Sequence, residues 1–325
     1  VANNHIKIYP KNSKGTPLDT YNSAKEFEEE GIEIVIGPIF YENLERLNEI
    51  DKITFISLTN SNKRTSNNII TFGININSQI NTIKKYLNKT QSNRTLLLSP
   101  KTQFLEQTEI FENSELKLKE VFFYNTNVKK ITNEIEKLTK YRERKKDLER
   151  RIKILEKSDL HKHKKELEKL EQMHTLGQVN FDTVIVLDFG ERLKSVLTSF
   201  IFSDVTSEKV DFFTVNQWFD ETLFNESALQ NLYFPAIDLN NLKKFNKKYI
   251  KKFNKKPNEV SILAYDALGL IYYCWFNNNF QFKKDQLYNK KGFKGLHGKF
   301  LIEENISKQK LKIYKVYKKK FVKVY

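Results

Sequence analysis

Side chains that could bind a ligand lie mostly where apolar, strand-like runs of the sequence end. Ser57 and Thr59 follow the run ITFI, and Ser99 ends the run TLLL. Ligands of open α/β sheets sit beyond the carboxyl ends of the strands, and helix N-termini there favour a carboxylate. The local alternative is that these hydroxyls cap helices and that Trp218 fills a lobe interface. The predicted ligand-binding residues are Phe40, Tyr41, Glu42, Ser57, Thr59, Asn60, Ser99, Phe189 and Trp218.

Catalytic and metal-binding motifs are absent from the sequence. It has no GxGxxG, Walker loop, CxxC, HExxH or GxSxG pattern. His161 and His163 are two residues apart and face apart on a helix, which argues against a metal site. Asp188 and Glu42 are the only candidates for the titratable pair that an enzyme on a flavodoxin-like sheet would need. We therefore expect no enzyme activity, no cofactor and no metal.

The chain is strongly basic, with 56 Lys and Arg against 40 Asp and Glu and a formal net charge of +16. Such an excess can indicate a nucleic acid or an anionic membrane. Lys and Asn are frequent even in plain surface stretches such as NNLKKFNKKYIKKFNKK, which favours a general compositional bias. Aromatic residues are not interleaved with a basic motif, so we expect no nucleic-acid partner. The single cysteine, Cys274, excludes an intrachain disulfide.

The first ninety residues alternate between strand-like and helix-like patterns joined by short loops. Strands are expected at 5–10, 32–37 and 53–59, and helices at 18–31, 41–50 and 78–89. A second series of this kind follows, and the end of the chain is rich in β patterns. This alternation predicts an α/β fold of parallel sheets flanked by helices, in two lobes. The expected division is 1–91 with about 238–290, 92–128 with 177–237, an insertion at 129–176, and a C-terminal β-rich segment at 291–325 that crosses back between the lobes.

The insertion at 129–176 is dense in Lys, Arg and Glu and has apolar residues at helical intervals. Ser158 and Asp159 near its middle can cap a second helix. The pattern predicts a protruding antiparallel helical hairpin with a thin apolar seam. It is either a solvated charged spur or a docking arm for another protein. The candidate partner-binding residues are Arg142, Arg150, Arg151 and Lys153.

Several stretches resemble the type I periplasmic binding proteins of the Leu/Ile/Val-binding family. They are SAKEFEEEGIEIVIGPIFYENLERL, ITFISLTNSN, EVSILAYDALGLIYY and GFKGLHGKFLIEE; the Ala264–Ala267 segment and the Gly292–Phe300 turn are the most specific. Within that family the chain looks most like the bacterial penicillin-binding protein activators. The features that suggest this branch are the segment from Asn216 to Ala236, the charged insertion, and the Gly-Pro-Ile-Phe ending of a strand.

The resemblance implies an exported, non-enzymatic protein of the periplasm that regulates peptidoglycan synthesis by protein contact. Its partner would be a peptidoglycan synthase or another envelope protein, and its groove could hold an amino acid or peptide. Relatives open with an apolar strand and a long helix that have no counterpart here, so this strand and helix are expected to be missing. Any lipidated cysteine, such as anchors an outer-membrane lipoprotein, would lie in that missing part.

The alternative within the same family is a solute-binding receptor of an ABC importer for amino acids or small amides. The amino-acid-binding relatives place hydroxyl residues directly after Gly-Pro. This sequence has Ile39, Phe40 and Tyr41 there. This difference favours the activator over the receptor.

Overall fold

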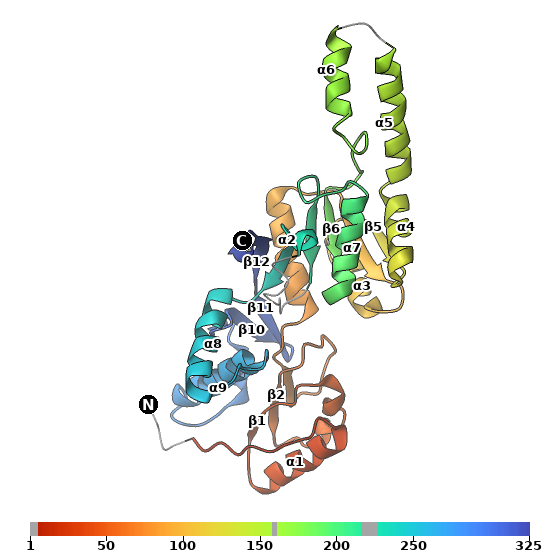
Figure 1. Cartoon of the computed structure of the whole chain (residues 1–325). Helices are drawn as coiled ribbons and strands as arrows, with labels where there is room; N and C mark the ends of the chain where they lie inside the picture. The colour runs from red at the N-terminus through yellow and green to blue at the C-terminus, as the bar shows by residue number, and fades with distance from the viewer. Residues whose placement is uncertain (1–5, 158–160, 216–225) are drawn as a thin grey trace. The chain divides into compact units, whose positions relative to one another are not determined.

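The computed structural model describes residues 6–157, 161–215 and 226–325, which form two compact units (Figure 1). Unit 1 comprises Val1–Gln79 and Ile237–Leu311, and unit 2 comprises Ile80–Ala236 and Lys312–Tyr325. Each unit contains one sheet with helices packed on it. The α/β class with parallel-dominated sheets is therefore confirmed.

Unit 1 is built on a six-stranded sheet in the order β1-β2-β3-β11-β10-β9. Strands β1, β2 and β3 are parallel, β11 is parallel to β3, and β10 is antiparallel to its two neighbours. The bounds are β1 Ile34–Ile36, β2 Thr54–Ser57, β3 Ile69–Thr71, β9 Phe293–Lys294, β10 Lys299–Glu303 and β11 Ile306–Lys310; the helices are α1 Pro17–Glu29, α8 Leu239–Phe253, α9 Ser261–Phe276, and the 3₁₀ turns η1 Tyr41–Leu44, η2 Leu47–Glu49 and η5 Lys284–Tyr288.

The start of unit 1 shows how its core forms. Thr16 accepts a hydrogen bond from the Asp19 N–H and caps α1, and Pro17 occupies the first helical position, where no N–H is needed. The helix buries Ala24 and Phe27 in one cluster with the side chains that follow β1. The helix expected at 41–50 is instead two short 3₁₀ turns, η1 and η2. Their inward residues are nevertheless the three expected ones: Leu44, Leu47 and Ile50.

One strand expectation in unit 1 fails, and one strand was not expected. Residues 6–10 were expected to form a strand but belong to no sheet, because no strand lies beside them to pair with. Strand β3 was not expected, since its run is only three residues long and follows a polar loop.

A buried polar pair joins helix α9 to the turn before β10 in unit 1. The Asp266 carboxylate accepts hydrogen bonds from the N–H groups of Leu296 and His297, both at 2.8 Å, and from the His297 ring. Glycine is the only residue type that fits at position 295, since a Cβ there would lie 2.4 Å from Asp266 Oδ2. The Gly292–Phe300 turn is thus fixed to the Ala264–Ala267 segment of α9.

Unit 2 is built on a seven-stranded sheet in the order β13-β12-β8-β7-β6-β4-β5. The five strands β8, β7, β6, β4 and β5 are parallel to one another, and β12 is antiparallel to both of its neighbours, β8 and β13. The bounds are β4 Thr95–Pro100, β5 Leu118–Tyr124, β6 Thr183–Val186, β7 Asp211–Thr214, β8 Tyr233–Ala236, β12 Lys312–Tyr317 and β13 Lys320–Lys323; the helices are α2 Ile76–Thr90, α3 Leu105–Glu112, α4 Val128–Leu138, α5 Tyr141–Glu156, α6 His161–Leu170, α7 Gly190–Phe202 and the 3₁₀ turn η4 Ser227–Leu229.

The charged insertion begins later than expected. Ile131 and Ile135 of α4 are fully buried in the main core of unit 2, where α4 packs beside α7. The hairpin proper is α5 and α6, which run side by side beyond the sheet of unit 2 (Figure 1). Its seam consists of Leu148, Leu155 and Leu170, with Ile152, Leu167 and Leu176 partly buried against them.

The observed division into units also differs from the expected one. Tyr86 of α2 packs its ring on Phe213 and Tyr233 in the sheet of unit 2, so residues 80–91 belong there and not with 1–79. The C-terminal segment 291–325 is split at residue 311, because β9, β10 and β11 complete the sheet of unit 1 and β12 and β13 that of unit 2.

Candidate functional site

In unit 2, an ion pair lies where β6 ends and α7 begins. The carboxylate of Asp188, which is fully buried, accepts hydrogen bonds from the Tyr124 hydroxyl at 2.6 Å and from Arg192 Nε at 3.0 Å. Burial, together with the hydrogen bond to Asp188, raises the pKa of the Tyr124 hydroxyl, and the same carboxylate raises the pKa of Arg192. Asp188 therefore orients two neighbours and is not positioned as a free general base.

Arg192 extends from this pair to the surface of unit 2. Its Nη2 donates to Gln103 Oε1 at 2.8 Å, and about a third of its side chain is exposed. The rings of Phe104 and Phe189 meet edge to face, 5.7 Å apart, and Phe189 is 52% exposed. The two rings follow Gln103 and Asp188, the hydrogen-bond partners of Arg192, in the chain. A guanidinium and aromatic rings on the same segments are suited to a carboxylate with an apolar body or to a protein surface of that chemistry.

Sequence reasoning found Asp188 and Phe189 at this site but missed Tyr124, Arg192, Gln103 and Phe104. The i, i+4 spacing of Asp188 and Arg192 on a helix start was the one signal that could have found the cation. Tyr124 and Gln103 come from other strand ends, and only the fold brings them there.

Ser99 lies at the end of β4 and is fully buried. Its Oγ accepts a hydrogen bond from the Thr108 hydroxyl at 2.8 Å, so the serine joins β4 to α3. Trp218 lies outside the described residues.

The candidates of unit 1 surround the end of β2. The Ser57 hydroxyl donates to the carbonyl of Pro38 at 2.8 Å and accepts from the Thr59 N–H at 3.3 Å, and Thr59 Oγ1 accepts from the Ser61 N–H. Ser57 and Thr59 are buried, whereas Phe40, Glu42 and Asn60 are exposed and Tyr41 is half-buried. These hydroxyls therefore shape the turn, and the side chains presented to solvent are an aromatic ring, a carboxylate and an amide.

The hairpin presents a mixed-charge surface. Arg142 pairs with Glu136, Arg150 with Asp147, and Arg151 with Glu166 across the two helices. Lys153 is exposed on α5. Of the four candidate residues, Arg151 joins α5 to α6 through its ion pair with Glu166. The other three, Arg142, Arg150 and Lys153, are exposed on α5.

A buried arginine fixes the base of the hairpin to unit 2. Arg144, only 7% exposed, donates from Nε to the carbonyl of Thr139, from Nη1 to the Thr175 hydroxyl and from Nη2 to the carbonyl of Ser203. Thr175 in turn donates to Asp204. We call Arg144, Thr175, Ser203 and Asp204 the arginine latch. It sets the direction of α5 against the end of α7, and sequence reasoning did not find it.

No group of three or more His, Cys, Asp or Glu side chains is arranged to hold a metal ion among the described residues. No described helix is long and apolar enough to cross a membrane.

Comparisons with known proteins were made at three levels. No family model matches the chain, and no curated protein matches it. Solved structures do match. The C-domain of LpoA from Haemophilus influenzae, described as a regulator of PBP1A, is 12% identical with a TM-score of 0.60, over 94% of this chain and 86% of that one. In full-length LpoA the match spans 50% of that chain.

Two transport proteins also match, with TM-scores slightly above that of the LpoA C-domain. An ABC transporter substrate-binding protein from Desulfitobacterium hafniense, solved in complex with Leu, is 11% identical with a TM-score of 0.61, over 98% of this chain and 88% of that one. A branched-chain amino acid ABC transporter periplasmic ligand-binding protein from Burkholderia xenovorans is 9% identical with a TM-score of 0.65, over 97% and 82%. At these identities the likeness shows the fold, and the neighbours are binding or regulatory proteins. The chain thus has the type I periplasmic-binding-protein fold.

Proposed function

We propose that this chain is a non-enzymatic, extracytoplasmic regulator that acts on a peptidoglycan synthase by protein contact. The observation that carries the proposal is the α5–α6 hairpin, held by the arginine latch and presenting Arg142, Arg150 and Lys153 to solvent. A helical pair anchored at its base is suited to contact between proteins, because its direction is set before the partner arrives. The likeness to the C-domain of LpoA, a regulator of PBP1A, supports this proposal.

The hydroxyls expected to hold an amino acid give further support. Ser57, Thr59 and Ser99 are buried, and their hydroxyls already form hydrogen bonds with Pro38, Ser61 and Thr108. A ligand would have to replace these bonds, and leaving the turns unpaired is costly. The predicted ligand-binding role of these residues stays a prediction.

The test is a truncation that leaves unit 2 intact. Removing all of 129–176 would also remove Ile131 and Ile135 from the core, so we would replace only 149–168 with a four-glycine turn. This keeps Arg144 and Thr175 of the latch. We expect the truncated protein to fold and to lose both binding to a peptidoglycan synthase and stimulation of its activity. Unchanged stimulation would contradict the proposal.

A charge-reversal series separates the hairpin from general charge effects. Arg142→Glu, Arg150→Glu and Lys153→Glu together should weaken synthase binding at least tenfold. The matched control reverses Lys243, Lys247 and Lys251 of α8, which are equally exposed. Equal losses in both triple variants would mean that only the net charge of +16 matters.

The second candidate function is an amino-acid receptor of an ABC importer. Arg192 favours it, since a partly exposed guanidinium on the segments that also carry Phe104 and Phe189 fits a carboxylate ligand. A receptor gains stability from its ligand by about 2.7 kcal/mol at a hundredfold excess over Kd. Titration of the protein with leucine, other amino acids and muropeptides, followed by thermal unfolding, distinguishes the two. A large shift with one amino acid, lost in Arg192→Leu, would favour the receptor.

A further inference from the structure

Helix α8 of unit 1 is both amphipathic and strongly basic. From 239 to 258 the chain contains eight Lys and no Asp, Glu or Arg. At 3.6 residues per turn, the lysines of the helix share one side and its apolar residues share the other. The lysines are Lys243, Lys244, Lys247, Lys248, Lys251 and Lys252. A basic amphipathic helix of this kind is typical of proteins that lie on a membrane surface.

The apolar side of α8 is incompletely covered. None of the 15 residues of the helix is buried, and Ile250 and Phe253 near its end are 40% and 53% exposed. The start of the helix is nevertheless fixed, because Asp238 caps the first turn and Asn241 Nδ2 donates to the carbonyl of Leu296 at 3.0 Å. The helix is therefore anchored at its first turn and presents apolar side chains to solvent at its last.

A row of aromatic rings runs along the same side of α8. The rings of Phe253 and Tyr249 lie 4.6 Å apart, and those of Tyr249 and Phe245 lie 6.0 Å apart. Phe245 meets Tyr265 of the neighbouring helix α9 at 5.7 Å (Figure 1), and Tyr265 is 57% exposed. Exposed tyrosines beside apolar rings suit the boundary of a membrane, where one end of the side chain is apolar and the other is wet.

Positive charges surround the exposed end of this row. Lys252 Nζ lies 5.5 Å from the ring centroid of Phe253, and Lys255 and Lys256 directly after the helix are exposed. None of these three lysines forms an ion pair with a carboxylate of the described residues. We define the α8 patch as Ile250, Lys252, Phe253, Lys255 and Lys256. It combines exposed apolar groups with cations that no acidic side chain neutralises.

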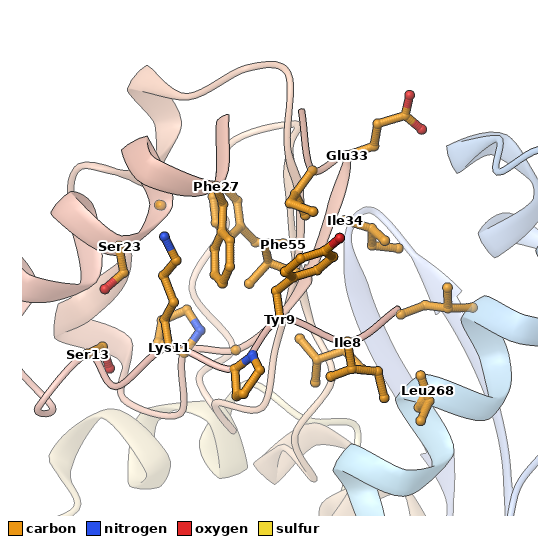
Figure 2. Close-up of a pocket in the computed structure, with 18 of the residues that line it drawn as sticks. Ile8, Tyr9, Lys11, Ser13, Ser23, Phe27, Glu33, Ile34, Phe55 and Leu268 are labelled. Atoms are coloured by element: carbon orange, nitrogen blue, oxygen red, sulfur yellow. The ribbon is translucent and has the colours of Figure 1, made fainter. Parts of the chain in front are cut away.

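A cavity of about 1140 Å³ in unit 1 is separate from this surface. It lies between the segment 6–11 and strand β1, with Ile8 and Tyr9 on one side and Leu268 of α9 on another (Figure 2). No residue of α8 is among the described residues that line it. The exposure of the α8 patch is therefore a property of the helix itself.

We propose that the α8 patch binds the surface of a membrane that contains anionic lipids. The lysines would contact the lipid phosphates, while Ile250 and Phe253 enter the boundary between head groups and acyl chains. With 15 residues, α8 is shorter than the roughly 20 needed to span a bilayer, so it would lie at the interface. A second copy of the chain fits less well, because it would bring eight like charges to the same contact.

The experiment is flotation of the whole chain with lipid vesicles. We expect binding to phosphatidylcholine mixed with phosphatidylglycerol to be at least tenfold tighter than to phosphatidylcholine alone, and to weaken as salt is added. Each lysine near an anionic surface strengthens binding about fivefold, so replacing Lys252, Lys255 and Lys256 together by Gln should weaken it about a hundredfold. The matched control replaces Lys318, Lys319 and Lys320 of unit 2, which are also exposed, and should have little effect.

Substitutions of Phe253 test whether the patch enters the membrane. Phe253→Ser should weaken vesicle binding several-fold, whereas Phe253→Leu should retain it and Phe202→Ser, at a 68% exposed position of α7, should change nothing. Phe253→Trp should be quenched by lipids with brominated acyl chains, beyond the signal of the two native tryptophans. Should Phe253→Ser fail to fold, the lysine variant, which changes only exposed side chains, still tests the proposal.

Any of four results would overturn the proposal. They are equal binding to both kinds of vesicle, equal losses in the two lysine variants, no quenching of Phe253→Trp, and binding of soluble heparin as tight as that of vesicles with the same loss in Phe253→Ser. The last would make a soluble anionic polymer the occupant. None of them concerns synthase binding by the hairpin, so this proposal and the proposed function fail independently.

Discussion

At the scale of single residues, Gly295 is a position where the fold leaves no room for a side chain. A Cβ there would meet the Asp266 carboxylate at 2.4 Å, and that carboxylate is fixed by His297 and the turn. We expect Gly295→Ala to lower the free energy of unfolding by about 1–3 kcal/mol, as overpacking does. Urea denaturation measures this. The control is Gly269→Ala, where no atom lies within 4 Å and the added methyl should stabilise α9 by about 0.5–1 kcal/mol.

Arg144 is the residue on which the direction of the hairpin depends. Arg144→Met leaves the carbonyls of Thr139 and Ser203 without their buried donor. We expect a loss of about 2–4 kcal/mol, since hydrogen bonds to charged groups contribute about 1.5–3 kcal/mol each. Arg142→Met, two residues away with a 75% exposed side chain, should change stability by less than about 0.5 kcal/mol. Equal effects of the two substitutions would refute the latch.

Asp204 gives the arginine latch a dependence on pH. Burial alone would raise the pKa of this carboxyl, but hydrogen bonds from Thr175 and Lys209 and the charges of Lys209 and Arg144 lower it overall. A depressed folded-state pKa contributes stability above the unfolded value of about 3.9 and loses it as pH falls through the folded value. Asp204→Asn should therefore destabilise the protein at pH 7 and have little effect near pH 2.

The Asp204→Asn comparison is clean because Asn tolerates the backbone at this position. Asp204 has φ +56°, a left-handed conformation that Asn also adopts readily. Urea denaturation of both proteins at the two pH values is the measurement. A difference that persisted unchanged at pH 2 would mean that the carboxylate charge is not what matters.

At the scale of elements, the α5–α6 hairpin is held by a thin seam. Three buried leucines line it, whereas α7 buries five side chains. We expect the amides of α6 to exchange by local opening, faster than those of α7. Leu155→Ala should accelerate exchange along both hairpin helices and leave α7 unchanged. The neighbouring control, Ile154→Ala, removes a side chain that is 56% exposed and should leave all rates as they are.

The sequence predicted elements well where apolar runs are long, and less well where packing decides. Strands β2, β4 and β6 coincide with continuous apolar runs of the sequence, and all three were expected. The pattern at 41–50 predicted the correct buried residues, Leu44, Leu47 and Ile50, but the wrong helix type. Two 3₁₀ turns can bury the same three side chains that an α-helix would bury. The strand pattern of residues 6–10 remained unpaired, because a strand forms only beside another.

The candidate site was predictable only in part for the same reason. A strand end can be read from the sequence, which is how Ser57 and Asp188 were found. The partner of each side chain comes from a distant segment. Tyr124 reaches Asp188 across 64 positions, and Arg144 reaches Ser203 across 59. These long-range contacts decide whether a hydroxyl is free to bind a ligand or is already hydrogen-bonded within the protein.

At the scale of the whole molecule, each unit has a hydrophobic core of its own among the residues that the structure describes. One, around Phe27 and Leu47, belongs to unit 1, and the other, around Val184 and Phe200, belongs to unit 2. Since each core is a cooperative structure of its own, we expect calorimetry to resolve two unfolding transitions. Gly295→Ala should lower the midpoint of one transition and Arg144→Met that of the other.

The double variant completes this test. Gly295 and Arg144 belong to different units and share no hydrogen-bond partner, so their effects should add within about 0.5 kcal/mol. A single transition lowered by both substitutions would mean that the two units unfold as one.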